Sequence, residues 1–423
     1  MKGRKMCFFL AGAVLGAGSL AGCSGQVNNG VTEIELVHYK QEAVDLFEEL
    51  EEKFNSTHDD IHLTISSPNE AMTILKTRFV REDYPDILGI GGDINFSYFI
   101  DSEILADVSG YERLSEIKES YVDILEGLEF VPTEGAYGVP YAANASGILY
   151  NREMFQEHGW EIPETWDELI TLCETIQSEG ILPFYFGYKD TWTCLAPWNA
   201  LAVGLASSNV CQQANAGETT FTDEYRETSE KMLKLLEYGE EGPFAYGYND
   251  ACTAFANGES AMYTIGSYAV PQIKSVNPDM DIDSFVMPGN EDADGNTLNS
   301  GVDLMFAVTE ACENKEAAFE VISFLLEDEN VQAYLDDQNA VPCKKGEFTL
   351  APNLDGMKKF IDEGNMTDYQ DHYYPAEMAV DAQIQTFLIE QDTDAFLSKF
   401  DKDWARYNRD IIRKVEAYNA ENQ

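Results

Sequence analysis

The chain has 423 residues, and 76 aspartates and glutamates against 27 lysines and arginines give a formal net charge of -49 at pH 7. Such an acidic surface repels phosphate backbones and anionic lipid headgroups, which argues against a nucleic-acid partner and disfavours anionic ligands. Because 44% of the residues are hydrophobic, the chain can fill substantial cores, and its length predicts two domains rather than one.

Residues 1–22 have the pattern of a bacterial secretory signal, with a basic start and an apolar run too short for a comfortable membrane span. The run ends in Leu-Ala-Gly-Cys, which resembles the lipobox of bacterial lipoproteins. This resemblance implies cleavage before Cys23 and a lipid on its sulfur, with an ordinary signal and a chance cysteine as the alternative. Residues 23–30 then form a tether. We therefore expect the protein at the outer face of the cytoplasmic membrane, held only through the lipid.

The next part of the chain alternates strand and helix patterns. Residues 34–39 and 61–66 are β-like runs, and between them residues 42–54 have apolar side chains at helical spacing. A second helix over 69–82 precedes a strand over 85–92 that ends in glycines. This β-α-β-α-β order predicts a largely parallel sheet covered by helices.

Long helices dominate after residue 151. The helix at 165–177 begins with Thr165 and Glu168 at the spacing of a capping box. Strand patterns return late in the chain, at 260–266, 283–288 and 303–309. We also expect a single last helix whose apolar side chains stack along one face, namely Phe400, Trp404, Tyr407 and Ile411. Late strands that resemble the early ones indicate a chain that returns to complete a sheet.

A chain that leaves a sheet and later rejoins it predicts two α/β lobes, joined by segments that pass from one lobe to the other. Three segments combine small, proline or glycine residues with strand-like neighbours, namely 138–147, 285–296 and 336–343, and they suit hinges whose backbone angles absorb closure. We expect lobe 1 to comprise 31–141 plus 286–338 and lobe 2 to comprise 142–285 plus 339–423.

Several motifs that would indicate a metal site or a specific enzyme class are incomplete or absent in the sequence. Six cysteines follow the tether, none in a Cys-x-x-Cys pair, and we interpret most of them as small core residues while their pairing stays open. Residues 290–301 begin like a calcium loop, but Gly301 occupies the position that requires a glutamate. No nucleophile elbow, Walker loop or dinucleotide fingerprint is present.

Four segments carry a family resemblance; they are 84–93, 138–170, 254–273 and 301–335. In this order and spacing the chain resembles extracellular solute-binding proteins of ABC importers, in the carbohydrate group of multiple-sugar, raffinose and maltose binders, although 189–245 matches poorly. The resemblance implies a periplasmic-binding-protein-like fold of class II type. It also implies a monomer that captures an oligosaccharide and presents it to permease subunits, with no cofactor, metal or catalysis.

Sugar chemistry selects candidate residues independently. A pyranose has flat C–H faces and a rim of hydroxyls, so its site needs aromatic planes and planar polar groups. Polar residues follow the first two strands: Lys40 after the first, and Asn69 and Glu70 after the second. Lys40 is either a donor to hydroxyls or a solvated lysine, and Asn69 is either a ligand contact or a helix cap.

The resemblance adds further candidates. Asp93 matches a position that accepts hydrogen bonds from sugar hydroxyls, and Asn144 corresponds to a polar residue at the family's first hinge. Tyr268 matches a stacking aromatic at a helix start. Asp371 and His372 are comparable to a late loop that grips one end of the sugar in raffinose-type relatives.

The remaining candidates are expected beside these residues. Two glycines and a serine would give a ligand access to the backbone, and an aspartate begins a returning strand. Aromatic residues supply further surface, although a tryptophan with apolar neighbours is more often a core residue. These candidates are Tyr141, Trp192, Trp198, Gly266, Ser267, Gly301 and Asp303.

Lys40 together with Asp371 and His372 favours an α-1,6-linked galactoside or glucoside. Two alternatives stay open. The first is a binding protein for a non-sugar solute. The second is a surface glycoside hydrolase, which needs two carboxylates about 5 to 9.5 Å apart. A chain with 76 acidic residues supplies carboxylate pairs by chance, so the sequence does not decide this point.

Overall fold

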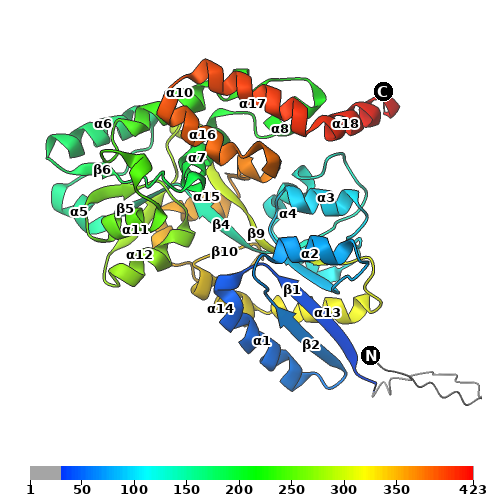
Figure 1. Ribbon diagram of the computed structural model, residues 1–423. Helices are drawn as coiled ribbons and strands as arrows, with labels where there is room; N and C mark the ends of the chain where they lie inside the picture. Colours follow the sequence, from blue (N-terminus) through cyan, green and yellow to red (C-terminus); the bar gives the residue numbers. More distant parts are fainter. Residues whose placement is uncertain (1–29, 423) are drawn as a thin grey trace, which may run out of the picture.

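The computed structural model describes residues 30–422 and contains two β-sheets, each covered by helices (Figure 1). A seven-stranded sheet has the order β10-β4-β9-β3-β1-β2, with β11 (Met366–Thr367) beside β9, and a four-stranded sheet has the order β6-β7-β5-β8. Two α/β lobes are therefore confirmed. The predicted signal, the lipidation at Cys23 and nearly all of the tether lie outside the described residues.

The first half of the larger sheet is parallel, as predicted. Strand β1 (Thr32–His38) pairs in parallel with both β2 (Ile61–Ser66) and β3 (Ile87–Ile90). Helices α1 (Val44–Thr57) and α2 (Ala71–Phe79) connect these strands and bury their apolar faces. The carboxyl ends of β1 and β3 consequently lie side by side, where a ligand site forms in sheets of this kind.

The chain returns to this sheet late, which confirms the interpretation for the predicted strand at 303–309, whereas the strands predicted at 260–266 and 283–288 belong to the smaller sheet. Strand β9 (Leu298–Val308) runs antiparallel between β3 and β4 (Val139–Ser146). Strand β10 (Val341–Pro342) also pairs with β4. The segment 336–343 therefore still belongs to the larger sheet, and the chain leaves it later than predicted.

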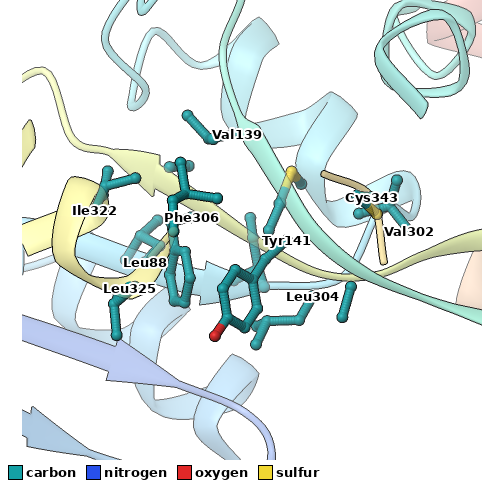
Figure 2. Close-up of a cluster of buried hydrophobic side chains, with 14 of the residues drawn as sticks. Leu88, Val139, Tyr141, Val302, Leu304, Phe306, Ile322, Leu325 and Cys343 are labelled. Carbon is teal, nitrogen blue, oxygen red and sulfur yellow. The ribbon is translucent and has the colours of Figure 1, made fainter. Parts of the chain in front are cut away.

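Helices α3 (Ile94–Asp101), α4 (Glu119–Gly127), α13 (Lys315–Leu325) and α14 (Asp328–Gln338) complete the first lobe. Its core lies around β4 and β9. Figure 2 shows Tyr141 in that cluster among Leu88, Leu304 and Phe306.

The second lobe is built on β5 (Ile148–Asn151), β6 (Leu182–Phe184), β7 (Ser260–Tyr263) and β8 (Ile282–Phe285). Its helix α6 (Trp166–Ser178) begins with the predicted capping box of Thr165 and Glu168. The other helices before β9 are α5 (Arg152–His158), α7 (Leu195–Leu205), α8 (Val210–Ala216), α9 (Phe221–Glu224), α10 (Arg226–Leu236), α11 (Tyr248–Ala256) and α12 (Val270–Val276).

The C-terminal part adds α15 (Lys358–Glu363), α16 (Val380–Glu390), α17 (Thr393–Tyr407) and α18 (Arg409–Glu421). The expected single last helix is thus two helices. Asn408 separates them with a backbone (φ -92°, ψ 10°) outside the helical region, and asparagine tolerates such turn conformations. The Phe400, Trp404, Tyr407 and Ile411 stack spans this break.

The chain passes between the sheets at Gly147, which alone separates β4 from β5, and again over 286–297 between β8 and β9. A Cβ atom on Gly147 would lie 2.4 Å from the Phe285 carbonyl oxygen, so only glycine fits there. The two passages therefore touch each other.

All six cysteines of the described region are buried and free, in agreement with their interpretation as core residues; they are Cys173, Cys194, Cys211, Cys252, Cys312 and Cys343. Within residues 30–422, no helix combines the length and the apolar character that a membrane crossing requires.

Candidate functional site

A cavity of about 280 Å³ lies where the strand ends of the larger sheet meet the second lobe. Its polar and aromatic lining comes from both lobes and from a late loop around residue 370. Eight of the predicted site residues line it: Asp93, Asn144, Trp192, Tyr268, Gly301, Asp303, Asp371 and His372.

Asp303 on β9 is the centre of a hydrogen-bond network on the first-lobe side. Its Oδ1 accepts from Asn144 Nδ2 at 2.9 Å. The Tyr39 hydroxyl lies 2.6 Å from the Asp303 carbonyl oxygen and 3.0 Å from Oδ1. The Asp303 side chain is only 8% exposed, so these partners fix its orientation before any ligand arrives.

Lys40 completes this network on the side of Asp303 that faces away from the cavity. Its Nζ lies 2.8 Å from Asp303 Oδ2 and 2.7 Å from a Glu42 carboxylate oxygen. Burial would lower the pKa of Lys40, but the charges of Asp303 and Glu42 outweigh burial and raise that pKa. Lys40 does not line the cavity and is not solvated, so both interpretations of this residue were wrong. It neutralises and positions Asp303.

Asp93 follows β3 and caps helix α3. Its Oδ1 accepts from the Asn95 backbone N–H at 2.8 Å, and the Asn95 side-chain amide lies 3.0 and 3.1 Å from its two oxygens. A carboxylate has about four lone-pair positions, so Asp93 keeps acceptor capacity toward the cavity that it lines.

Aromatic rings form the second-lobe side. Tyr268 lies in a short 3-10 turn after β7, and its ring centroid is 6.4 Å from that of Trp192, with the planes at 51°. Trp192 also packs 4.9 Å from Tyr248 and stays 40% exposed. These two rings offer apolar faces to an occupant of the cavity.

Gly266 and Ser267 act differently from the prediction. A Cβ atom on Gly266 would lie 2.2 Å from a Tyr268 ring carbon and 2.6 Å from Ser146 Oγ, so protein atoms occupy the room beside this glycine. Ser267 is 2% exposed, and its carbonyl accepts from Asn339 Nδ2 at 2.8 Å. Neither residue lines the cavity, and both support the Tyr268 turn instead.

The late loop closes the remaining side. Asn199 Nδ2 donates to Asp371 Oδ1 at 2.8 Å, and the Asp371 N–H donates back to Asn199 Oδ1 at 3.3 Å. His372 Nδ1 lies 2.8 Å from Asp368 Oδ1. Burial opposes protonation of His372, but the carboxylates, chiefly Asp368, raise its pKa to about 9. The ring is therefore cationic at neutral pH, with both nitrogens as donors.

Gly301 allows this loop to approach β9. A Cβ atom there would lie 2.2 Å from Asp368 Oδ1 and 2.8 Å from His372 Cε1. The room that we expected beside Gly301 is thus filled mainly by the late loop, which carries Asp371 and His372 to the cavity.

Tyr141 and Trp198 were wrongly assigned to the site. Tyr141 is fully buried between Phe306 and Tyr334, at ring-centroid distances of 5.0 and 5.2 Å, and its hydroxyl donates to the Asn330 carbonyl (Figure 2). Trp198 is fully buried in the second lobe, with its indole N–H 3.3 Å from the Tyr374 hydroxyl. Both are core residues because their rings pack on the inner faces of their elements.

Asn69 and Glu70 also lie outside the cavity. Both are exposed, and the N-cap of α2 is Glu70, which has a φ of 55° and makes no side-chain cap bond. Asn69 is therefore neither a cavity residue nor the N-cap of α2. The second strand contributes less to the site than its neighbours because β2 is at the edge of the sheet.

Sequence reasoning missed three polar residues of the lining: Tyr39, Asn199 and Tyr369. Tyr39 directly follows β1, so its place at a strand end was a usable signal. Asn199 is an amide inside the otherwise apolar helix α7, which also points to a polar function. The Tyr369 hydroxyl lies 2.7 Å from Ser146 Oγ, a contact that no local pattern indicates.

The arrangement offers hydrogen-bond donors, acceptors and apolar faces to a ligand. Among residues 30–422, no group of three or more histidine, cysteine, aspartate and glutamate side chains is placed to hold a metal ion. The lining supplies acceptors from Asp93, Asp303 and Asp371, donors from His372 and Asn144, and two aromatic faces.

Comparison with known proteins finds sugar-binding proteins among those similar to this chain. A multiple sugar-binding protein of Streptococcus mutans is 28% identical over 342 residues, which cover 77% of this chain and 80% of that protein. The melibiose/raffinose/stachyose-binding protein MelE of Bacillus subtilis is 27% identical over 180 residues, 40% of this chain and 41% of MelE.

Solved structures show the same fold. The apo form of RafE from Streptococcus pneumoniae superimposes with a TM-score of 0.80 at 22% identity, over 89% of this chain and 98% of that one. A complex of RafE with raffinose gives a TM-score of 0.75 over 89% of this chain and all of the other. The family model described as bacterial extracellular solute-binding protein matches residues 40–332. The chain therefore belongs to the bacterial extracellular solute-binding proteins.

Proposed function

We propose that this protein captures a neutral oligosaccharide outside the cell and delivers it to the permease of an ABC importer. One observation carries the proposal: a single cavity joins the Tyr268 and Trp192 rings to the network around Asp303. This pairing of apolar faces with fixed acceptors matches the two surfaces of a pyranose. The names of the relatives that bind multiple sugars, or melibiose, raffinose and stachyose, support a sugar ligand.

The cavity encloses one end of the ligand. Its volume of about 280 Å³ lies at the lower limit of small-molecule sites, which span about 300–1,000 Å³. The terminal sugar ring occupies it, and the following units extend into the space between the lobes. His372 and Asp371, which grip the end of this cavity, favour an α-1,6-linked galactoside or glucoside.

Capture proceeds by closure of the lobes. The Asp303 network belongs to the first lobe and the two rings belong to the second, so a bound sugar contacts both lobes only when they approach each other. A ligand shifts this equilibrium by the free energy of the contacts that it gains on closure. The proposed boundaries are 31–141 plus 286–338 and 142–285 plus 339–423, except that residues 142–146 and 341–342 move with the first lobe because they pair in its sheet. The monomer is held at the outer face of the cytoplasmic membrane through a lipid on Cys23.

Isothermal titration calorimetry against raffinose, melibiose, isomaltose, maltose and xylo-oligosaccharides tests the proposal. We expect micromolar binding of at least one saccharide, which corresponds to about 8 kcal/mol. Tyr141→Phe, altered in the core and not in the cavity, is the matched control and should bind equally well. Binding of a peptide or metal ion instead would identify a non-sugar receptor, and release of a hydrolysed product would identify an enzyme.

A further inference from the structure

A second and larger cavity, of about 700 Å³, opens between the lobes beside the late loop. The first lobe contributes residues 126–133, which form the end of α4 and the segment after it. The second lobe contributes α8 and the junction of α17 and α18, which face α3 and α4 across the gap in Figure 1. His372 lines the first cavity and Tyr373 lines the second. One turn of the chain therefore separates the two cavities.

The side chains around this cavity resemble a carbohydrate site in their chemistry. Aromatic rings come from both lobes, with Phe130 on one side and Trp404 and Tyr418 on the other. Several amides, including Gln213 and Asn408, lie between them. No lysine, arginine or histidine is among the described lining residues, whereas four carboxylates are, so an anionic ligand is disfavoured.

One amide in this wall lacks a partner. Asn408 is only 1% exposed, and its Nδ2 makes no hydrogen bond, although the residue lines the cavity. The neighbouring Trp404 indole N–H already donates to Asn215 Oδ1 at 3.0 Å. A buried donor without an acceptor is unfavourable, and a hydroxyl of an occupant would supply the missing acceptor.

The two cavities are physically divided. Gln212 Nε2 donates to the Gly127 carbonyl at 2.5 Å, which ties the lobes together beside the late loop. A Cβ atom on Gly127 would lie 3.4 Å from the Tyr373 hydroxyl, so this side chain fills the remaining gap. A molecule in the second cavity would therefore bind separately from one in the first.

We propose that the second cavity is an additional binding site for a neutral saccharide, a proposal that rests on the proposed function of the first cavity. Phe130 and Tyr418, which are both partly exposed, supply the apolar faces, and the Asn408 amide donates to a sugar hydroxyl. Trp404, which is 3% exposed, lies in the wall beside them. Saccharide at this site spans both lobes beside the Gln212–Gly127 contact and stabilises the arrangement in which they touch.

The five tryptophans of the chain provide the test, since Trp192 reports on the first cavity and Trp404 on the second. Indole N–H resonances are followed by NMR during titration with raffinose, melibiose, isomaltose and maltose in turn. In the Tyr268→Ala variant, which weakens the first site, we expect at least one saccharide to shift the Trp404 resonance saturably while Trp192 responds weakly.

Asn408→Leu should weaken the Trp404 response at least tenfold while the melting temperature stays equal or rises, because the unpaired donor is gone. A merely structural role would lower the melting temperature instead. Asn257→Leu is the matched control, since Asn257 is an exposed amide that lines neither cavity. Phe130→Ala, on the opposite lobe, should weaken the response as well.

Three outcomes would overturn the second site: no Trp404 shift with any of the four saccharides, loss of both responses together in Tyr268→Ala, or an unchanged Trp404 titration in both Asn408→Leu and Phe130→Ala. If Trp192 responds in the wild-type protein while Trp404 never does, only this inference fails. If neither tryptophan responds and calorimetry finds no saccharide, the proposed function fails with it.

Discussion

The two walls of the first cavity differ in how firmly their side chains are held. On the first-lobe wall, Asp303 is held by Tyr39, Lys40 and Asn144 at distances of 2.6 to 3.0 Å, so its geometry exists before binding. On the second-lobe wall, the rings of Trp192 and Tyr268 contact each other loosely and stay partly exposed. For the proposed function, this difference predicts that the polar wall sets which ligand fits, whereas the aromatic wall supplies apolar area once the lobes approach.

The strongest way to break the polar wall is Asp303→Ala. This change leaves Lys40, which is 7% exposed, with only Glu42 as a counter-ion and leaves Asn144 without its acceptor. Removing one partner of a buried pair costs about 3 to 5 kcal/mol, and we expect this loss in the free energy of unfolding measured by urea denaturation. Sugar binding should disappear. Asp303→Asn should cost less, and equal stability of the alanine variant and the wild type would contradict the network.

His372 lies between the two walls, and its titration makes the stability of the folded protein depend on pH. Its folded pKa of about 9 exceeds the ordinary histidine value of 6.5, so its contribution to stability is full below pH 6.5 and is lost as the pH rises through 9. The difference in pKa corresponds to a contribution of up to about 3 kcal/mol. In His372→Gln this pH-dependent part should be absent. Unfolding free energies of both proteins at pH 6.5 and pH 9 check this expectation, and parallel pH profiles would refute it.

Tyr268→Ala tests the aromatic wall alone. The change removes the stacking face but no member of the Asp303 network, so we expect binding to weaken at least tenfold, about 1.4 kcal/mol, with the fold intact. Calorimetry with the tightest saccharide measures the affinity, and circular dichroism checks the fold. Tyr268→Phe, which keeps the ring, should remain close to the wild-type affinity; unchanged affinity in the alanine variant would remove this residue from the site.

The smallest effect is expected away from both walls, at Tyr141. Tyr141→Phe loses one buried hydrogen bond, 3.2 Å long, to the Asn330 carbonyl. We expect a loss of about 1 kcal/mol in the free energy of unfolding and no change in sugar affinity. A weaker affinity in this variant would show that the core behind β4 controls the cavity, and the separation of the two walls from the core would need revision.

Much of the fold followed from local patterns. The period of apolar residues gave the β-α-β-α-β order, and the late strand at 303–309 correctly indicated a returning chain, whereas 283–288 lies in the smaller sheet. The sequence predictions were wrong where contacts between distant segments determine the secondary structure. Strand β10 has only two residues, and its pairing with β4 is invisible in the sequence. The break at Asn408 was missed because the apolar side chains keep their helical spacing across it.

The site was predictable where a residue sits at a strand end or a turn, as Asp93, Asp303 and Tyr268 do. Tyr141 was a misjudgement that strand geometry could have prevented. Residues 141 and 144 are three apart on one strand, and side chains alternate in direction with a period of two, so a regular strand does not point both at one cavity. Lys40 was harder, because its partner Asp303 is distant in sequence and only the folded sheet brings them together.

Gly147 gives the molecule a pivot. A methyl group at this position would collide with the Phe285 carbonyl oxygen, so the end of β4 in the larger sheet and the end of β8 in the smaller sheet are held against each other at one point. Sliding of one lobe along the other would break that contact, whereas swinging about it would not. We therefore expect the proposed closure of the lobes to be a rotation about this contact, and we expect Gly147→Ala to hinder it without changing a side chain of either cavity.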